Sequence, residues 1–214
     1  MIVVKVGGAA AAGAMPALDG EVCVVHGAGP QITSEMEQRG LPVEFVRGRR
    51  VTSAAALEVV RDALTAVNRS LCAAIGPRAV GLMGDEIGLQ ARQIPELGLV
   101  GAPVPCRPVA VVAALAEGLV PVVAPLAAGP LNVNADEMAA ALAAGLGAER
   151  IVFLTDVPGL LRDGAVVQAI PADEAEDLLA SGELEGGILP KLTAAVAAAR
   201  RGVAASIGET AVHV

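Results

Sequence analysis

The sequence predicts an α/β fold in which helices lie on a parallel β-sheet. Hydrophobic residues make up 54% of the chain, yet it holds only two Phe and no Tyr or Trp. Such a core must consist of closely packed Ala, Val and Leu, which suits helices on a parallel sheet. In the stretch 131–160, a polar run, an Ala-rich helix and a solid apolar run follow one another. A chain of 214 residues can bury one substantial core or two small ones, so a single α/β unit with two lobes is expected.

The individual elements follow from apolar runs and from the glycines and prolines that interrupt them. Short apolar or β-branched runs predict strands at residues 2–6, 21–25, 78–83, 120–124, 151–154, 166–170 and 203–207. Longer segments predict helices at residues 31–39, 54–74, 109–117, 136–144, 172–180 and 190–201. Hairpins are expected at 41–52 and 89–94, and residues 9–20 leave room for a short helix at most.

The stretch 131–160 is the one around which the chain is expected to be organised. Its helix should begin near Asp136 and end at about Ala144, because Gly145 and Gly147 are stop signals. With the strand that follows, it reads as a β-α-β step that has a polar loop at each end. The polar run before the helix could be only an N-cap, and for these residues in isolation the cap is the better interpretation.

Charge and cysteine content exclude several classes of function. The net charge of −8 and the pI near 4.8 argue against binding to nucleic acid or to an anionic membrane. Apolar runs are shorter than the ~18 residues that a spanning helix needs, and the N-terminal run has a lysine inside it, unlike a signal peptide. The three widely spaced cysteines favour a reducing cytoplasm and have no metal-ligand spacing.

The two lysines are candidates for phosphate binding. Among 15 basic residues, only Lys5 and Lys191 are lysines, and each lies near a glycine pair. Lysine is a compact charge that can follow a phosphoryl group, although either lysine alone could simply be solvated. Glycines around Ala28, just before a helix, would leave backbone amides free to bind an anion. His26 at the end of its strand is interpreted as structural.

Three arginines lie together in the hairpin at 41–52. Arg47 and Arg49 should share one face, for which a solvated turn is a reasonable interpretation. Arg50 should take the other face, near a helix that Thr52 or Ser53 caps, and it is the better candidate to reach a carboxylate. The helix at 54–74 is amphipathic and could be a dimer contact, with core packing as the default.

Taken together and in order, these motifs resemble the amino acid kinase family, and they cover nearly the whole chain. The matching pieces are VVKVGG (3–8), VVHGAGPQI (24–32), FVRGRRVT (45–52), LGLVG (97–101), PVVAPL (121–126), LNVNAD (131–136), LTDVPGLL (154–161) and GGILPKL (186–192). The resemblance implies a three-layer αβα sandwich with a central, mainly parallel sheet. It also implies an N-terminal lobe (1–127) for acyl amino acid binding and dimerisation, and a C-terminal lobe (128–214) for ATP.

The implied activity is ATP-dependent phosphorylation of the side-chain carboxylate of N-acetyl-L-glutamate, in arginine biosynthesis, with Mg²⁺ held mainly by the ATP phosphates. The implied catalytic residues are Lys5 on the transferring phosphate, Lys191 on the nucleotide phosphates and Asp136, which would orient both lysines. Backbone donors to the phosphoryl group and the attacked carboxylate would come from Gly7, Gly8, Ala28 and Gly29. Arg50 and Asn132 would hold the substrate, and the nucleotide pocket would include Thr155, Asp156 and Gly159.

Two alternatives remain open. The arginine-rich hairpin could serve a kinase that acts on glutamate or 2-aminoadipate attached to an acidic carrier protein, although the chain is itself acidic. The fold could also be a catalytically inactive amino-acid sensor, for which Lys5, Lys191 and Asp136 would be unnecessary.

The resemblance extends to assembly and regulation. A cytoplasmic homodimer built on the helix at 54–74 is expected. Insensitivity to arginine is expected too, because the chain starts at its first strand. Family members usually have glycine where Ala28 stands, and the added methyl group could narrow the anion cradle.

Overall fold

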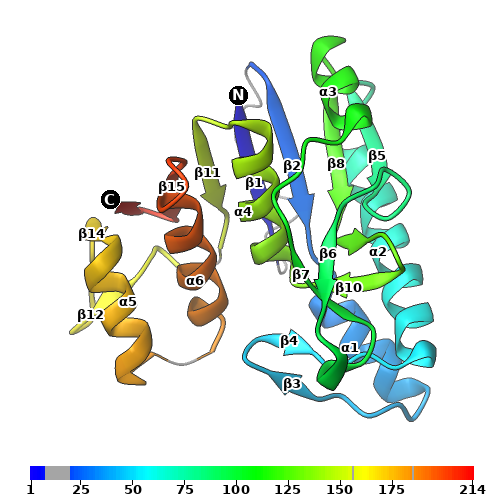
Figure 1. Ribbon diagram of the computed structural model, residues 1–214, viewed down its shortest axis with the longest axis horizontal. Coiled ribbons are helices and arrows are strands. Elements are labelled where there is room, and N and C mark those ends of the chain that lie inside the picture. Colours follow the sequence, from blue (N-terminus) through cyan, green and yellow to red (C-terminus); the bar gives the residue numbers. More distant parts are fainter. Residues whose placement is uncertain (8–19, 156, 185) are drawn as a thin grey trace.

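The computed structural model describes residues 1–7, 20–155, 157–184 and 186–214. An eight-stranded sheet runs through the molecule in the order β14-β16-β15-β11-β1-β2-β8-β5 (Figure 1). Neighbouring strands are parallel except β15 and β16, which are antiparallel. The strands are β1 Ile2–Val6, β2 Val22–His26, β5 Ala79–Met83, β8 Val120–Ala124, β11 Arg150–Phe153, β14 Ala169–Pro171, β15 Ala204–Ile207 and β16 Thr210–His213.

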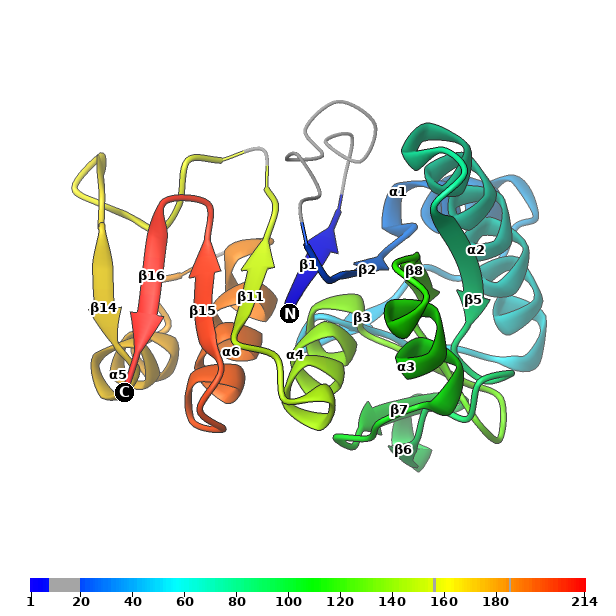
Figure 2. The ribbon, with the colours of Figure 1, turned by 90° about the horizontal axis from the view of Figure 1, so that it is seen from above.

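Helices lie on both faces of this sheet, so the predicted three-layer αβα sandwich is confirmed (Figure 2). One face carries α1 Gly29–Gln38 and α2 Ala54–Ile75, the latter capped by Ser53, whose Oγ accepts from Ala56 N at 3.2 Å. The other face carries α3 Val109–Ala116, α4 Ala135–Leu146, α5 Ala172–Ser181 and α6 Ile188–Ala199.

The core consists mainly of Ala, Val and Leu, as the composition predicts. Alternate residues of each strand point to opposite faces. In β2, Val22 and Val24 pack on the α2 side, whereas Cys23 and Val25 pack on the α4 side. Among the helices of the described residues, none is long and apolar enough to cross a membrane.

The remaining strands form smaller sheets. A four-stranded sheet has the order β6-β7-β10-β9, and a 3-10 turn, η2 Pro95–Leu97, lies between β6 and β7. Two short hairpins, β3-β4 and β12-β13, stand apart from it. The strands are β3 Phe45–Val46, β4 Arg49–Arg50, β6 Ala91–Gln93, β7 Val100–Pro103, β9 Leu126–Ala127, β10 Leu131–Val133, β12 Leu161–Arg162 and β13 Ala165–Val166.

The polar run that opens the stretch 131–160 forms strand β10, so the stretch does not begin with the loop expected of the β-α-β step. Helix α4 and strand β11 form as predicted, but β10 pairs with β7 and β9 in the smaller sheet. After β8, Pro125 has no N–H to donate to a ladder, and the chain folds back as the antiparallel pair β9-β10. Helix α4 therefore connects two sheets, and its first turn lies where they meet.

Gly145 does not end α4, contrary to the sequence prediction. The helix continues to Leu146 and ends at Gly147, which has φ 70° in the left-handed conformation that favours glycine. Gly145 has a packing role instead, because a Cβ there would lie 2.1 Å from the backbone oxygen of Cys106. Its missing side chain lets the segment before α3 cross the helix closely.

Two further predictions near the C-terminus need correction. The strand expected at 166–170 is split between β13 and β14, because β13 pairs back on β12 across Asp163 and Gly164, whose φ angles are both positive, whereas β14 joins the main sheet. The strand predicted at 203–207 forms as β15, but a turn at Gly208 then leads into a further strand, β16, that was not predicted.

His26 is structural, as expected, and fully buried at the end of β2. Asn68 of α2 donates from Nδ2 to His26 Nε2 at 3.0 Å, and His26 Nδ1 lies 3.3 Å from the Gly27 carbonyl oxygen. Both contacts are satisfied by a neutral ring with its proton on Nδ1. Burial is the main cause that lowers the pKa of His26 to about 4, and the charge of Lys5 lowers it further against the opposing Gly27 hydrogen bond.

A Gly145→Ala substitution should destabilise the fold. Alanine favours a helix over glycine by about 1 kcal/mol, but its Cβ would strike the backbone of Cys106. We expect a net fall of about 1–3 kcal/mol in the free energy of unfolding, measured by urea denaturation. An equally or more stable variant would contradict the close crossing.

Acid should destabilise the protein through His26. The unfolded histidine binds a proton below its ordinary pKa of 6.5, whereas the folded one stays neutral down to about 4. The free energy of unfolding should therefore fall between these pH values by at most about 3 kcal/mol. Comparing the pH dependence of unfolding in the wild type and in His26→Gln isolates this contribution; parallel profiles would show that His26 makes none.

Candidate active site

A buried ion pair joins β1 to the first turn of α4. Lys5 Nζ lies 2.9 Å from Asp136 Oδ1, and the two side chains are only 6% and 7% exposed. Apart from this pair, Asp136 Oδ1 accepts no hydrogen bond from the part of the chain that the structure describes. The positive end of α4 favours the carboxylate. Burying two charges is costly and is weak evidence for stability, so the pair is better explained by chemistry at this point.

Gly7 lies two residues after Lys5, and the Lys5 ammonium group takes up the space where a side chain at Gly7 would begin. A Cβ at Gly7 would lie 2.6 Å from Lys5 Nζ. Gly7 also lines two cavities, one on each side of it. Gly8, the other glycine of the predicted cradle, lies outside the described residues.

The first cavity, which we call the hairpin cavity, has a volume of about 220 Å³ and is lined in part by the β3-β4 hairpin. It brings together the residues predicted to bind the acyl amino acid and two of the three predicted catalytic residues: Lys5, Gly7, Ala28, Gly29, Arg50, Asn132 and Asp136. These residues come from β1, the start of α1, β4, β10 and α4. A small space lined by lysine, arginine and asparagine side chains suits a small carboxylate.

Arg50 points inward from β4, as predicted, and is 6% exposed. Its guanidinium donates to Thr33 Oγ1 at 2.7 Å and to the Gly29 carbonyl oxygen at 3.2 Å, and lies 4.5 Å from the centre of the Phe45 ring. Burial lowers the pKa of Arg50, but arginine stays charged at any physiological pH. These neutral contacts fix the cation beside the cavity without neutralising it.

Ala28 and Asn132 complete this cavity. Ala28 precedes α1 with φ −143°, which any residue adopts, and its methyl group is buried in a cluster with Ile32 and Met36. The methyl group of Ala28 is therefore accommodated without backbone strain. Asn132 donates from Nδ2 to Thr52 Oγ1 at 3.0 Å, which orients its amide.

The second cavity, which we call the α6 cavity, has a volume of about 440 Å³. Its lining includes Gly7, Thr155, Gly159 and Lys191, together with apolar residues such as Leu160 and Ile188. Lys191 donates from Nζ to the Gly187 carbonyl oxygen at 3.2 Å. Asp156, predicted for this pocket, lies outside the described residues.

The catalytic trio is therefore divided between two adjoining cavities. Lys5 and Asp136 line the hairpin cavity, Lys191 lines the α6 cavity, and Gly7 belongs to both. The contact of Asp136 with Lys5 is present, whereas the orientation of Lys191 by Asp136 stays a prediction.

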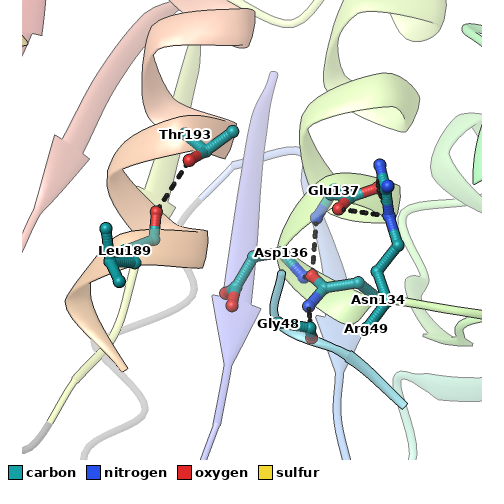
Figure 3. Close-up of polar contacts among 7 residues, drawn as sticks. All are labelled: Gly48, Arg49, Asn134, Asp136, Glu137, Leu189 and Thr193. Atoms are coloured by element: carbon teal, nitrogen blue, oxygen red, sulfur yellow. Dashed lines mark hydrogen bonds and ion pairs between the residues drawn. The ribbon is translucent and has the colours of Figure 1, made fainter. Parts of the chain in front are cut away.

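Sequence reasoning missed the role of the residues that hold the site together. Asn134 caps α4, as the N-cap interpretation allows, because its Oδ1 accepts from Asp136 N at 2.9 Å and from Glu137 N at 3.1 Å (Figure 3). Its Nδ2 also donates to the Gly48 carbonyl oxygen at 3.0 Å. Arg49, expected in a solvated turn, instead pairs with Glu137; only the chain reversal shown by the fold brings these two residues together.

The turn between β15 and β16 supports the α6 cavity in a similar way. Thr210 Oγ1 accepts from Leu160 N at 2.8 Å, and Glu209 N donates to the Pro158 carbonyl oxygen at 2.7 Å. A Cβ at Gly159 would lie 2.5 Å from Thr210 Oγ1, which explains this glycine. No motif in the sequence points to this contact.

Metal ligands do not gather in the described residues, where His, Cys, Asp and Glu side chains form no group of three or more that could hold an ion.

Comparison with known proteins identifies the family of this chain. The family model described as "Amino acid kinase family" matches residues 1–208. The acetylglutamate kinase of Rubrobacter xylanophilus is 46% identical over 96% of this chain and 87% of its own length. The solved structure of smu.665 from Streptococcus mutans superposes with a TM-score of 0.86 at 26% identity, covering 99% of this chain and 98% of that one.

A more distant solved structure, the carbamate kinase of Giardia lamblia bound to AMP-PNP, has a TM-score of 0.67 at 16% identity, covers 97% of this chain and 91% of its own, and supports the fold alone. Because the family model matches residues 1–208 and the relative from Rubrobacter xylanophilus is 46% identical, the chain belongs to the amino acid kinase family.

Proposed function

We propose that the protein transfers the γ-phosphoryl group of ATP to the side-chain carboxylate of N-acetyl-L-glutamate, as a step in arginine biosynthesis. The observation that carries this proposal is the adjacency of the two cavities, which share Gly7 beside the Lys5–Asp136 pair. A carboxylate in the hairpin cavity and a triphosphate in the α6 cavity would meet at that point. The 46% identity to a relative named acetylglutamate kinase supports the choice of substrate.

The hairpin cavity supplies what a dicarboxylate needs. Arg50 would bind the carboxylate that does not react, and Asn132 would donate to the acylated end. The reacting carboxylate would face Gly7 and Lys5. It is already ionised at neutral pH, so it can attack the phosphorus without a general base.

In the transfer step, a bond forms between the carboxylate oxygen and the γ-phosphorus while the bond to the ADP oxygen breaks. Charge then moves across the three equatorial oxygens and onto ADP, so catalysis is mainly positioning and charge neutralisation. Lys5 would neutralise the transferring group, and Asp136 would hold Lys5 in place through the 2.9 Å pair. Backbone amides at Gly7 and at the start of α1 would bind the oxygens.

ATP would occupy the α6 cavity, within the C-terminal lobe 128–214, while the N-terminal lobe 1–127 would hold most of the acyl amino acid site. Apolar side chains such as Leu160 and Ile188 suit a base, and Lys191 at the first turn of α6 suits phosphate. Magnesium would be held mainly by the ATP phosphates, and it would supply further charge neutralisation when bound.

The carrier-protein alternative has less support from the hairpin than its sequence implies. Of the three arginines, Arg50 is buried in the cavity wall and Arg49 is paired with Glu137, which leaves Arg47 exposed. One exposed arginine is a weak docking surface for an acidic carrier. A free small substrate is therefore favoured.

A screen coupled to ADP release tests the proposal. We expect turnover with free N-acetyl-L-glutamate, and less with glutamate or 2-aminoadipate. Turnover only with substrate attached to an acidic carrier protein would favour that alternative, and binding of N-acetylglutamate without turnover would favour a sensor.

Lys5→Met should lower kcat by roughly 10²–10³ because it removes one electrostatic group from the transition state. Binding of N-acetylglutamate should remain measurable by calorimetry. Unchanged turnover would refute the role of Lys5. Loss of both binding and the folded circular dichroism signal would show that the pair supports the fold instead.

We further propose a cytoplasmic homodimer built on α2 and the neighbouring edge of the sheet. Strand β5 ends the eight-stranded sheet, and α2 and β5 together line a hollow of about 410 Å³ that includes Arg69, Cys72 and Gly81. An open edge strand beside an exposed helix is a ready surface for pairing with a second copy.

Light scattering should therefore give twice the chain mass of 21.2 kDa. Arg69→Glu should shift the protein toward the monomer, whereas Glu183→Arg, at an exposed position beyond α5, should not. A wild-type monomer, or equal effects of both substitutions, would contradict this interface.

A further inference from the structure

The β3-β4 hairpin carries Arg50 but has little structure of its own. Each strand has two residues, and they pair in a separate two-stranded sheet. Phe45 and Val46 are 54% and 39% exposed, so the hairpin buries little apolar surface through β3. Isolated two-stranded hairpins are marginally stable in water. The position of Arg50 over the hairpin cavity must therefore depend on contacts that the hairpin makes with other elements.

Besides the hydrogen bonds of Arg50 to Thr33 and Gly29, the hairpin has a polar anchor in a bidentate ion pair between Arg49 and Glu137. Arg49 Nε lies 2.9 Å and 3.2 Å from the two carboxylate oxygens of Glu137, and Nη2 lies 3.0 Å from Oε2. The two side chains are 27% and 18% exposed, which is more enclosed than an ordinary surface pair. A fork of this kind fixes orientation as well as distance, because two parallel hydrogen bonds must be satisfied at once.

Two further contacts lie at the hairpin turn. Asn134, the N-cap of α4, donates to the Gly48 carbonyl oxygen at 3.0 Å. A Cβ at Gly48 would lie 3.4 Å from the Cβ of Pro190, the residue before Lys191. The turn therefore lies against the start of α6. The hairpin thus contacts α4 on one side and the helix of the α6 cavity on the other.

Consecutive carboxylates of α4 face different parts of the site. Neighbouring helical residues point about 100° apart, so Asp136 and Glu137 diverge from the same turn. Figure 3 shows Asp136 directed toward β1 while Glu137 meets Arg49 on the side of the hairpin. One rigid helical turn therefore holds Lys5 through Asp136 and the hairpin through Glu137.

We propose that Glu137 and Arg49 are positioning residues for the acyl amino acid. By fixing the hairpin to the first turn of α4, they set the separation between Arg50, which would bind the unreactive carboxylate, and Lys5, which faces the reacting one. This inference rests on the proposed function. It predicts that breaking the pair weakens binding of the acyl amino acid and leaves binding of ATP almost unchanged, because Arg49 lines the hairpin cavity and neither residue is among those that line the α6 cavity.

The test compares Arg49→Glu, Glu137→Arg and the double variant that exchanges the two charges. Each single variant should raise the KM for N-acetylglutamate about tenfold, as expected for loss of a charge-assisted bidentate pair. The KM for ATP should change by less than about twofold, and the double variant should recover to within about threefold of the wild type, since the pair can form again in reverse. Arg47→Glu is the matched control, because it makes the same charge change at an exposed position of the same hairpin.

Several results would overturn the inference. One is an unchanged KM for N-acetylglutamate in both single variants. Another is a double variant whose KM for N-acetylglutamate is higher than that of either single variant. A third is an equal rise of this KM in Arg47→Glu. If N-acetylglutamate bound more tightly to Glu137→Gln and more weakly to Arg49→Glu, Arg49 would be shown to bind the substrate itself.

Amide hydrogen exchange at residues 45–51 gives a second readout that needs no substrate. Exchange should quicken in both single variants and not in the control, and unchanged exchange would overturn the anchoring. If the exchange data supported the anchoring of the hairpin but the wild-type enzyme gave no turnover, the result would instead count against the proposed function.

Discussion

The ion pair between Lys5 and Asp136 is the constraint on which the rest of the site depends. It places a cation at 2.9 Å from a carboxylate in a nearly dry environment, where charges interact strongly and the desolvation of each must be offset by the other. Three features of the surrounding structure hold this ion pair in place. The strand that carries Lys5 lies in the centre of the sheet, Gly7 leaves space for the ammonium group, and the N-terminus of α4 stabilises the carboxylate.

The first turn of α4 organises both cavities because it lies between the two sheets. Asn134 caps the helix and contacts the hairpin, Asp136 binds Lys5, and Glu137 binds Arg49. Small side chains make this arrangement possible. The helix is rich in alanine and lets Gly145 pack against the backbone near Cys106, so α4 fits closely between β1 and the segment that precedes α3. A core with larger aromatic residues could not bring these elements so near.

Most of the fold could be predicted from the sequence. Parallel strands that are buried on both faces appear as apolar runs, and glycines and prolines mark the ends of the helices between them. Lys5 could be named because it precedes a glycine pair, and Arg50 because it lies where the hairpin leads into a helix, whereas the roles of Asn132 and Asp136 were implied by the family resemblance. What could not be predicted depends on contacts distant in sequence. Arg49 and Glu137 are 88 residues apart, and Thr210 supports a loop 50 residues before it. The strand β10 and its pairing in a second sheet were hidden because its short Leu-Asn-Val sequence lies in a polar run and its partner β7 is distant in sequence.

The most direct measurement of the central claim is a crystal structure with ADP, aluminium fluoride and N-acetylglutamate bound together. We expect the fluoride group between the two cavities, with Lys5 Nζ and Gly7 N within hydrogen-bonding distance of it, Asp136 still paired with Lys5, and the acyl amino acid beside Arg50. A fluoride group bound away from Lys5, or an acyl amino acid outside the hairpin cavity, would contradict the account.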